Sequence, residues 1–159
     1  MQHRRTRKRR ARDGAVAVEF AFLAPVLLAL VLGVAEASRL LDAQNRLATA
    51  TREGARLAAM DRDDVLGEGQ STNEKIDADI RNFLDACGMP GDAATITISD
   101  VDDPDTPFDL DDPANDLELF RVRVELPYSS VTMVDVPVMN EIHLVSELVF
   151  RNARATIVQ

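Results

Sequence analysis

GAVAVEFAFLAPVLLALVLGVAEA, residues 14–37, is the stretch that decides the architecture of this chain of 159 residues. Residues 15–35 carry one charge, Glu19. As an α-helix they would measure about 32 Å, close to the hydrocarbon core of a bilayer, about 30 Å. A buried helix of a soluble protein is the alternative, but the abrupt basic flank described next makes it a poor one. The sequence therefore predicts a transmembrane helix over residues 15–36.

Charge is distributed very unevenly on the two sides of this helix. Residues 1–14 hold seven bases and one acid, whereas residues 15–159 hold 11 bases and 26 acids, a net charge of −15. Basic residues that flank a membrane helix favour the cytoplasmic side. The acidic remainder argues against nucleic acid as a partner of the Arg-rich head. We therefore expect a basic cytoplasmic leader at 1–14 and a single-pass protein of the cytoplasmic (inner) membrane, with its C-terminal domain extracytoplasmic.

The helical pattern continues beyond the apolar run, over residues 37–60, which contain no proline. Small and apolar residues recur there at intervals of three or four, as on one face of a helix. They are Leu40, Ala43, Leu47, Ala50, Gly54 and Leu57. A helix over 15–60 would measure about 69 Å, and the polar stretch 61–73 is expected to end it.

The rest of the chain, residues 61–159, reads as a small acidic domain. Residues 74–87 predict an amphipathic helix that ends at Gly88 and Pro90. Its apolar face comprises Ile76, Ile80, Phe83, Leu84 and Cys87. Alternating patterns predict strands at 94–98, 120–126 and 142–150, and Pro137 demotes a weaker candidate at 131–138. The predicted fold class is α+β: a long N-terminal membrane-spanning helix, followed by a domain made of a short helix and an antiparallel sheet.

Glu19 is the residue of the apolar run that needs an explanation. A carboxylate at mid-membrane costs roughly 2.5–3.5 kcal/mol, and less near the interface. In the first turn of the helix it would be stabilised by the macrodipole. If the chain were cut after Gly14, the new ammonium of Ala15 would supply a partner, within one subunit or between neighbours. The alternative is a carboxylate that merely reaches the lipid headgroups.

The same residues carry a family resemblance. Gly14 followed by AVAVEF resembles the cleavage site of type IV prepilins and pseudopilins, and residues 14–59 resemble the TadE-like family of the Tad (tight adherence) pilus-assembly system. The shared elements are VEFA, Pro25 followed by leucines, the step from Glu36 to Arg39, and REGAR at 52–56. Ala37 stands where the family often has an aromatic residue. TadE-, TadF- and TadG-like members share this region, so the subtype stays open.

The resemblance implies a pseudopilin-like component of Tad/Flp-type pilus assembly or secretion. Prepilin peptidase would cut between Gly14 and Ala15, and Glu19 would guide assembly. The implied partners are other pilin-like subunits, the pilus-assembly machinery, the peptidase and membrane lipid. Whether the subunit enters the finished pilus is not implied.

Small residues form a stripe along the apolar helix. They recur at strict intervals of four, a pattern that lets a second membrane helix approach closely. They are Ala17, Ala21, Pro25, Ala29 and Gly33, continued by Ala37. Pro25 removes one backbone hydrogen bond and is expected to bend the helix. Beyond the stripe, the charges at Arg52, Glu53 and Arg56 predict either a solvated surface or a contact with a neighbouring subunit.

No pattern in the sequence points to catalysis or to a cofactor. Cys87 is the only cysteine, and the two histidines lie in unrelated regions, so a zinc site has no ligand set. The acidic segment 99–118 lacks the spacing of a calcium-binding loop, which favours a solvated loop over a calcium site. We therefore expect a protein that is not an enzyme, with no metal or cofactor.

Two other interpretations stay open. Ala35-Glu36-Ala37 has the small-x-small form of a signal-peptidase site, and a cut there would release a soluble acidic domain that begins at Ser38. The chain could also be an unprocessed, membrane-anchored binding module.

Overall fold

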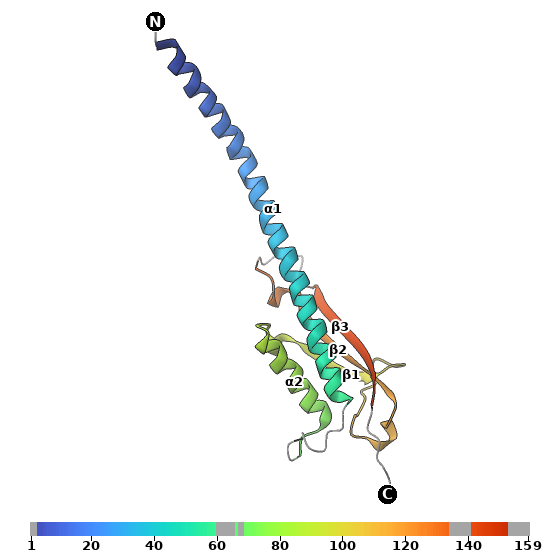
Figure 1. Ribbon diagram of the computed structural model, residues 1–159. Coiled ribbons are helices and arrows are strands. Elements are labelled where there is room, and N and C mark those ends of the chain that lie inside the picture. Colours follow the sequence, from blue (N-terminus) through green and yellow to red (C-terminus); the bar gives the residue numbers. More distant parts are fainter. Residues whose placement is uncertain (1–2, 60–65, 67–68, 134–140, 153–159) are drawn as a thin grey trace. The chain divides into compact units, whose positions relative to one another are not determined.

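The computed structural model describes residues 3–59, 66, 69–133 and 141–152, with side chains from Gly14 onward within these ranges. Two helices, α1 (His3–Ala58) and α2 (Thr72–Ala86), precede three strands, β1 (Thr95–Asp100), β2 (Leu119–Pro127) and β3 (His143–Arg151) (Figure 1). Short 3-10 turns lie at 91–93, 113–115 and 128–130. The chain divides into two compact units, residues 1–38 and 39–159. The fold is α+β, as predicted.

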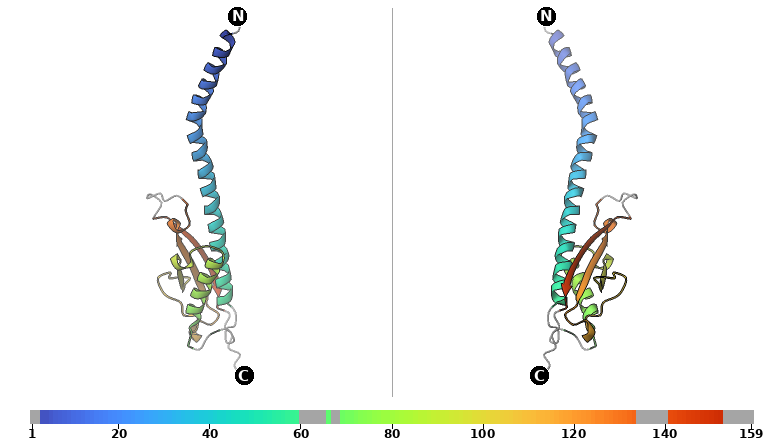
Figure 2. Two further views of the ribbon diagram at one scale, coloured as in Figure 1. Left: turned by 90° about the vertical axis from the view of Figure 1, so that its left-hand side faces the viewer. Right: turned by 90° about the vertical axis from the view of Figure 1, so that its right-hand side faces the viewer.

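The first unit is the N-terminal part of α1. The helix begins at His3 rather than at Ala15, because residues 3–13 are mostly arginine, lysine and alanine, which favour helix, and contain neither proline nor glycine. Figure 2 shows a bend in the blue part of α1, the part that contains Pro25. Twelve large apolar side chains between Val16 and Val34 are 52–76% exposed. By length and composition this is the one helix among the described residues able to cross a membrane.

In the second unit, the face of α1 that the periodicity predicts is the face that packs. Ala43, Leu47, Ala50 and Gly54 are buried there, and Leu40 and Leu57 are half-buried. The buried face is wider than predicted and also includes Thr51, Ala55 and Ala58. Thr51 is tolerated in the core because its hydroxyl donates to the carbonyl of Leu47, 2.8 Å away.

Helix α2 begins two residues earlier than the sequence indicates, because a capping box fixes its start. The hydroxyl of Ser71 accepts from the backbone N–H of Glu74, whose carboxylate accepts from the N–H of Ser71. At the other end, Gly88 has φ +74° and stops the helix as predicted.

The buried face of α2 is narrower than the predicted one. Thr72, Ile76, Ile80 and Leu84 are buried. Phe83 is half-buried, and so is Cys87, which occupies the C-cap. Cys87 therefore lies at the end of the helix, beyond the face that packs.

The sheet is antiparallel, with strand order β1-β2-β3. Its inner face is centred on β2, where alternate side chains are fully buried and form the core with α1 and α2. They are Phe120, Val122, Val124 and Leu126. The outer face carries Arg121, Arg123 and Glu125, as expected for a sheet with one solvated side. Residues 131–133 of the weaker strand candidate form no strand, and the remainder, with Pro137, lies outside the described residues, as does much of the 61–73 stretch.

The acidic segment is more ordered than the predicted solvated loop. Four of its carboxylates, those of Asp100, Asp103, Asp109 and Asp112, accept hydrogen bonds from backbone N–H groups two or three residues further along the chain. Two of its apolar residues are buried: Leu110 is fully buried, and Phe108 packs on Phe120 with ring centroids 5.7 Å apart, whereas Leu117 is exposed. Most of the segment is an irregular loop with exposed residues, as predicted. Its turn-forming and buried residues were not predicted, because aspartates that shape turns have the same composition as solvated ones.

Candidate functional site

The predicted processing and assembly residues all lie on α1, on the exposed apolar segment. Gly14, Ala15 and Glu19 are exposed, and Ala15 and Glu19 are one helical turn apart. A Cβ added at Gly14 would meet no atom within 4 Å. Glu19 makes no hydrogen bond or ion pair with the side chains that the structure describes. Packing within one chain therefore constrains neither Gly14 nor Glu19.

The stripe of small residues is exposed in the same way. Ala17, Ala21, Pro25 and Ala29 have no covering neighbour in their unit, and a Cβ at Gly33 would meet nothing within 4 Å. Soluble monomers rarely expose a continuous apolar surface of this length. The segment thus has the composition and exposure of a surface made for lipid or for other apolar helices.

The REGAR segment, residues 52–56, has a packing role as well as a charged surface. A Cβ built on Gly54 would overlap the Cγ1 and Cδ1 atoms of Ile80, so the glycine allows α1 and α2 to cross closely. Ala55 is fully buried. Arg52 is exposed, and Arg56 pairs with Glu53 at the surface. The hydrogen bond from Arg56 lowers the pKa of the Glu53 carboxyl.

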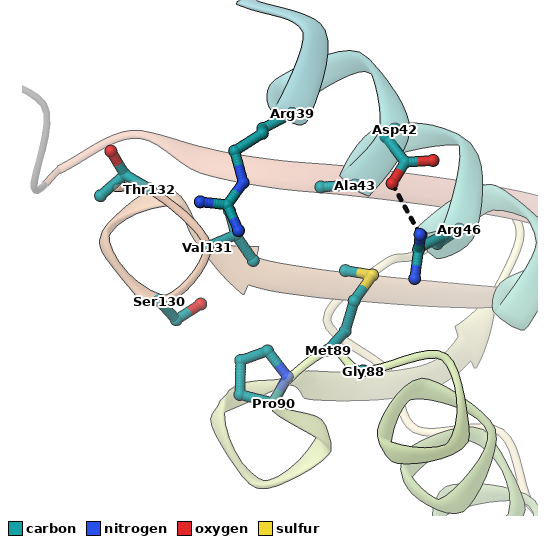
Figure 3. A pocket seen from close by; sticks show the side chains of 10 residues that line it. All are labelled: Arg39, Asp42, Ala43, Arg46, Gly88, Met89, Pro90, Ser130, Val131 and Thr132. Atoms are coloured by element: carbon teal, nitrogen blue, oxygen red, sulfur yellow. Dashed lines mark ion pairs between the residues drawn. The ribbon is translucent and has the colours of Figure 1, made fainter. Parts of the chain in front are cut away.

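A pocket of about 280 Å³ lies in the second unit, where α1 faces the loop after α2 and the turn after β2. Figure 3 shows the side chains of Arg39 and Arg46 on the same wall, with Met89 and Pro90 opposite. Arg46 pairs with Asp42 at 2.8 Å and also donates to the carbonyl of Cys87. Among the described residues Arg39 has no hydrogen-bond or ion-pair partner.

Sequence reasoning missed this pocket. The spacing of Arg39 and Arg46, seven residues on one helix, signals a shared face. The opposite wall comes from residues 88–90 and 130–132, which only the tertiary fold brings there.

Within the described part of the chain, no group of three or more His, Cys, Asp or Glu side chains is arranged to hold a metal ion. In the acidic segment several carboxylates accept local hydrogen bonds. Asp111, for example, accepts from the N–H of Thr72, 2.7 Å away, and from its hydroxyl. These aspartates therefore have structural functions in the turns and at the start of α2.

Comparison with known proteins supports the interpretation of α1. Residues 14–56 match the family model described as TadE-like protein. No curated protein and no solved structure matched the chain. The matched segment spans the exposed apolar run and continues through Leu47 and Gly54, the residues by which α1 packs in the second unit.

Proposed function

We propose that this chain, whose residues 14–56 form a TadE-like segment, is a pseudopilin-like subunit of Tad/Flp-type pilus assembly or secretion. It is anchored in the cytoplasmic membrane by α1, its basic leader faces the cytoplasm, and its acidic domain lies outside. Prepilin peptidase removes the leader after Gly14.

The observation that carries this proposal is the exposed apolar surface of α1 with a lone carboxylate in it. Between Val16 and Val34 the large side chains are more than half exposed, and Glu19 has no partner among the described side chains. A simple anchor requires only apolar residues. An intramembrane carboxylate is costly, and it indicates a function in which it acquires a partner.

Cleavage after Gly14 provides that partner. In the intact chain the nitrogen of Ala15 is a peptide nitrogen inside α1 and carries no charge. Once the leader is removed, the same atom is an ammonium, one turn from Glu19 or available to the Glu19 of a neighbouring subunit. Cleavage also removes seven bases that hold the N-terminus at the cytoplasmic face. The two effects together convert an anchored precursor into a subunit that can associate laterally through the stripe Ala17–Gly33.

The test is the Glu19→Gln variant, which keeps the shape of the side chain and removes its charge. We expect membrane insertion as good as in the wild type or better, since the amide costs less to bury. Pilus formation and co-purification of partner pilin-like subunits are expected to fall. Both are compared at matched membrane abundance, with the exposed Glu118→Gln as the control. Assembly and co-purification at the wild-type level in Glu19→Gln would show that Glu19 only reaches the headgroups.

One observation favours the signal-peptidase alternative. The boundary between the two compact units falls at Ser38/Arg39, one residue from the Ser38 start of the domain that a cut after Ala37 would release. Against it, α1 runs without a break through Ala35–Ala37, so the helix would have to unwind for cleavage. Determining the N-terminal residue of the mature protein distinguishes cleavage after Gly14 from cleavage after Ala37.

A further inference from the structure

We propose that the pocket between Arg39 and the turn at 130–132 binds the phosphate of a phospholipid headgroup. This inference depends on the membrane anchoring proposed above, but not on a function in pilus assembly.

The charge of the pocket is the first argument. Its lining contributes two guanidinium groups, those of Arg39 and Arg46, and one carboxylate, that of Asp42. The pocket therefore has a net positive charge, in a chain whose residues 15–159 carry −15. Arg46 is engaged by Asp42 and by the Cys87 carbonyl. Arg39 keeps its donors available within the described residues.

The donors of the pocket suit a phosphate oxygen. A guanidinium presents N–H groups in a planar fork that matches phosphate in a bidentate manner. Hydroxyl groups of Ser130 and Thr132 line the side of the pocket that the Arg39 side chain approaches (Figure 3). The hydroxyl of Ser130 donates to the carbonyl of Pro127 at 2.6 Å, so the guanidinium of Arg39 supplies both the donors and the positive charge for the phosphate.

The remaining lining and the size fit a headgroup. Ala43, Met89, Pro90 and Val131 give the pocket an apolar portion against which glycerol carbons can pack. Its volume of about 280 Å³ lies just under the range of about 300–1,000 Å³ usual for drug-sized ligands. A phosphate with its glycerol fits this space, whereas the acyl chains stay in the bilayer.

The position of Arg39 along the helix favours a lipid phosphate over a free anion as the ligand. Arg39 follows Ala35, the last residue of the apolar run, by four residues, about 6 Å along an α-helix. The headgroup layer on each side of the hydrocarbon core is roughly 5–8 Å thick. Helical side chains also lean towards the N-terminus, here towards the membrane. Arg39 therefore lies at the depth of the headgroup phosphates.

Binding of a short-chain lipid to the full-length chain in detergent tests this inference. Dioctanoylphosphatidylglycerol is titrated calorimetrically against wild type, Arg39→Gln and the control Arg52→Gln, an exposed arginine of the same helix outside the pocket. We expect wild type and Arg52→Gln to bind alike and Arg39→Gln to bind about tenfold more weakly, as for the loss of a charged hydrogen bond. Arg39→Lys, which keeps the charge without the fork, is expected to be intermediate.

Three results would overturn it. If Arg39→Gln and Arg52→Gln bound the lipid with equal affinity, Arg39 would not be part of the binding site. Equal binding of dioctanoylglycerol, which has the same chains but no phosphate, would show that the acyl chains alone are recognised. Inorganic phosphate that binds as tightly as the lipid would assign the pocket to a soluble anion. Since purified chain is used, none of these outcomes depends on pilus assembly, and a failure of the Glu19→Gln test would leave the lipid result standing.

Discussion

Gly14 and Gly54 lie on the same helix, but different physical requirements explain them. At Gly54 there is no room for a side chain, because Ile80 of α2 occupies the space where a Cβ would project. At Gly14 there is room in every direction, so folding of the chain gives no reason for glycine there. The proposed cleavage gives a reason that lies outside the chain: the active site of the peptidase would require a small residue at this position.

Gly54→Ala is expected to destabilise the second unit by about 1–2 kcal/mol. Overpacking against the buried Ile80 costs typically 1–3 kcal/mol, and the gain in helix propensity returns up to about 1 kcal/mol. The measurement is chemical unfolding of the full chain in detergent. Gly33→Ala, where a Cβ meets nothing, is the control and should not lose stability. The cost of Gly54→Ala should shrink in an Ile80→Val background, and an undiminished cost there would contradict the steric explanation.

At the scale of elements, the first turn of α2 holds the acidic segment in place. The amide nitrogen of Asn73 donates to the carbonyl of Phe108 at 2.7 Å, and its oxygen accepts from the N–H of Leu110 at 3.1 Å. From the other side, the buried Asn152 donates to the carbonyls of Leu110 and Asn115. These bonds bring Phe108 and Leu110 into the core although aspartates surround them.

Asn73→Ala is therefore expected to cost about 1–3 kcal/mol, because it leaves a carbonyl and an N–H of the acidic segment without their partner. Asn82→Ala, an exposed position on the same helix, is the matched control. Chemical unfolding of the full chain gives the difference. Equal stability of the two variants would mean that the acidic segment is not held by Asn73.

The sequence predicts this fold well wherever burial is periodic along one element. The faces of α1 at Leu47 and of α2 at Ile80, and the alternation along Phe120–Leu126, follow from local spacing alone. The packing of Phe108 and the Arg39 pocket did not follow, because each joins segments distant in the chain. The start of α2 at Ser71 could have been predicted from the sequence, since Ser71 and Glu74 have the capping-box spacing.

At the scale of the whole molecule, topology is the first matter to test. With seven bases before the span, we expect residues 39–159 outside the cytoplasm. Protease added to intact spheroplasts should then remove a C-terminal epitope tag, while a cytoplasmic marker survives until detergent is added. A tag that is protected until lysis would reverse the orientation.

The central claim is that this chain is a precursor cut after Gly14, and intact-mass and N-terminal peptide mass spectrometry of the membrane-extracted protein tests it most directly. We predict a mature chain that begins at Ala15 in the wild type. Gly14→Phe should be inserted normally but keep its leader, because a Cβ at this exposed position meets no atom within 4 Å and the larger side chain is expected to obstruct the peptidase. A wild-type chain that begins at Ser38 would establish the exported-domain alternative, and one that retains residues 1–14 would contradict processing altogether.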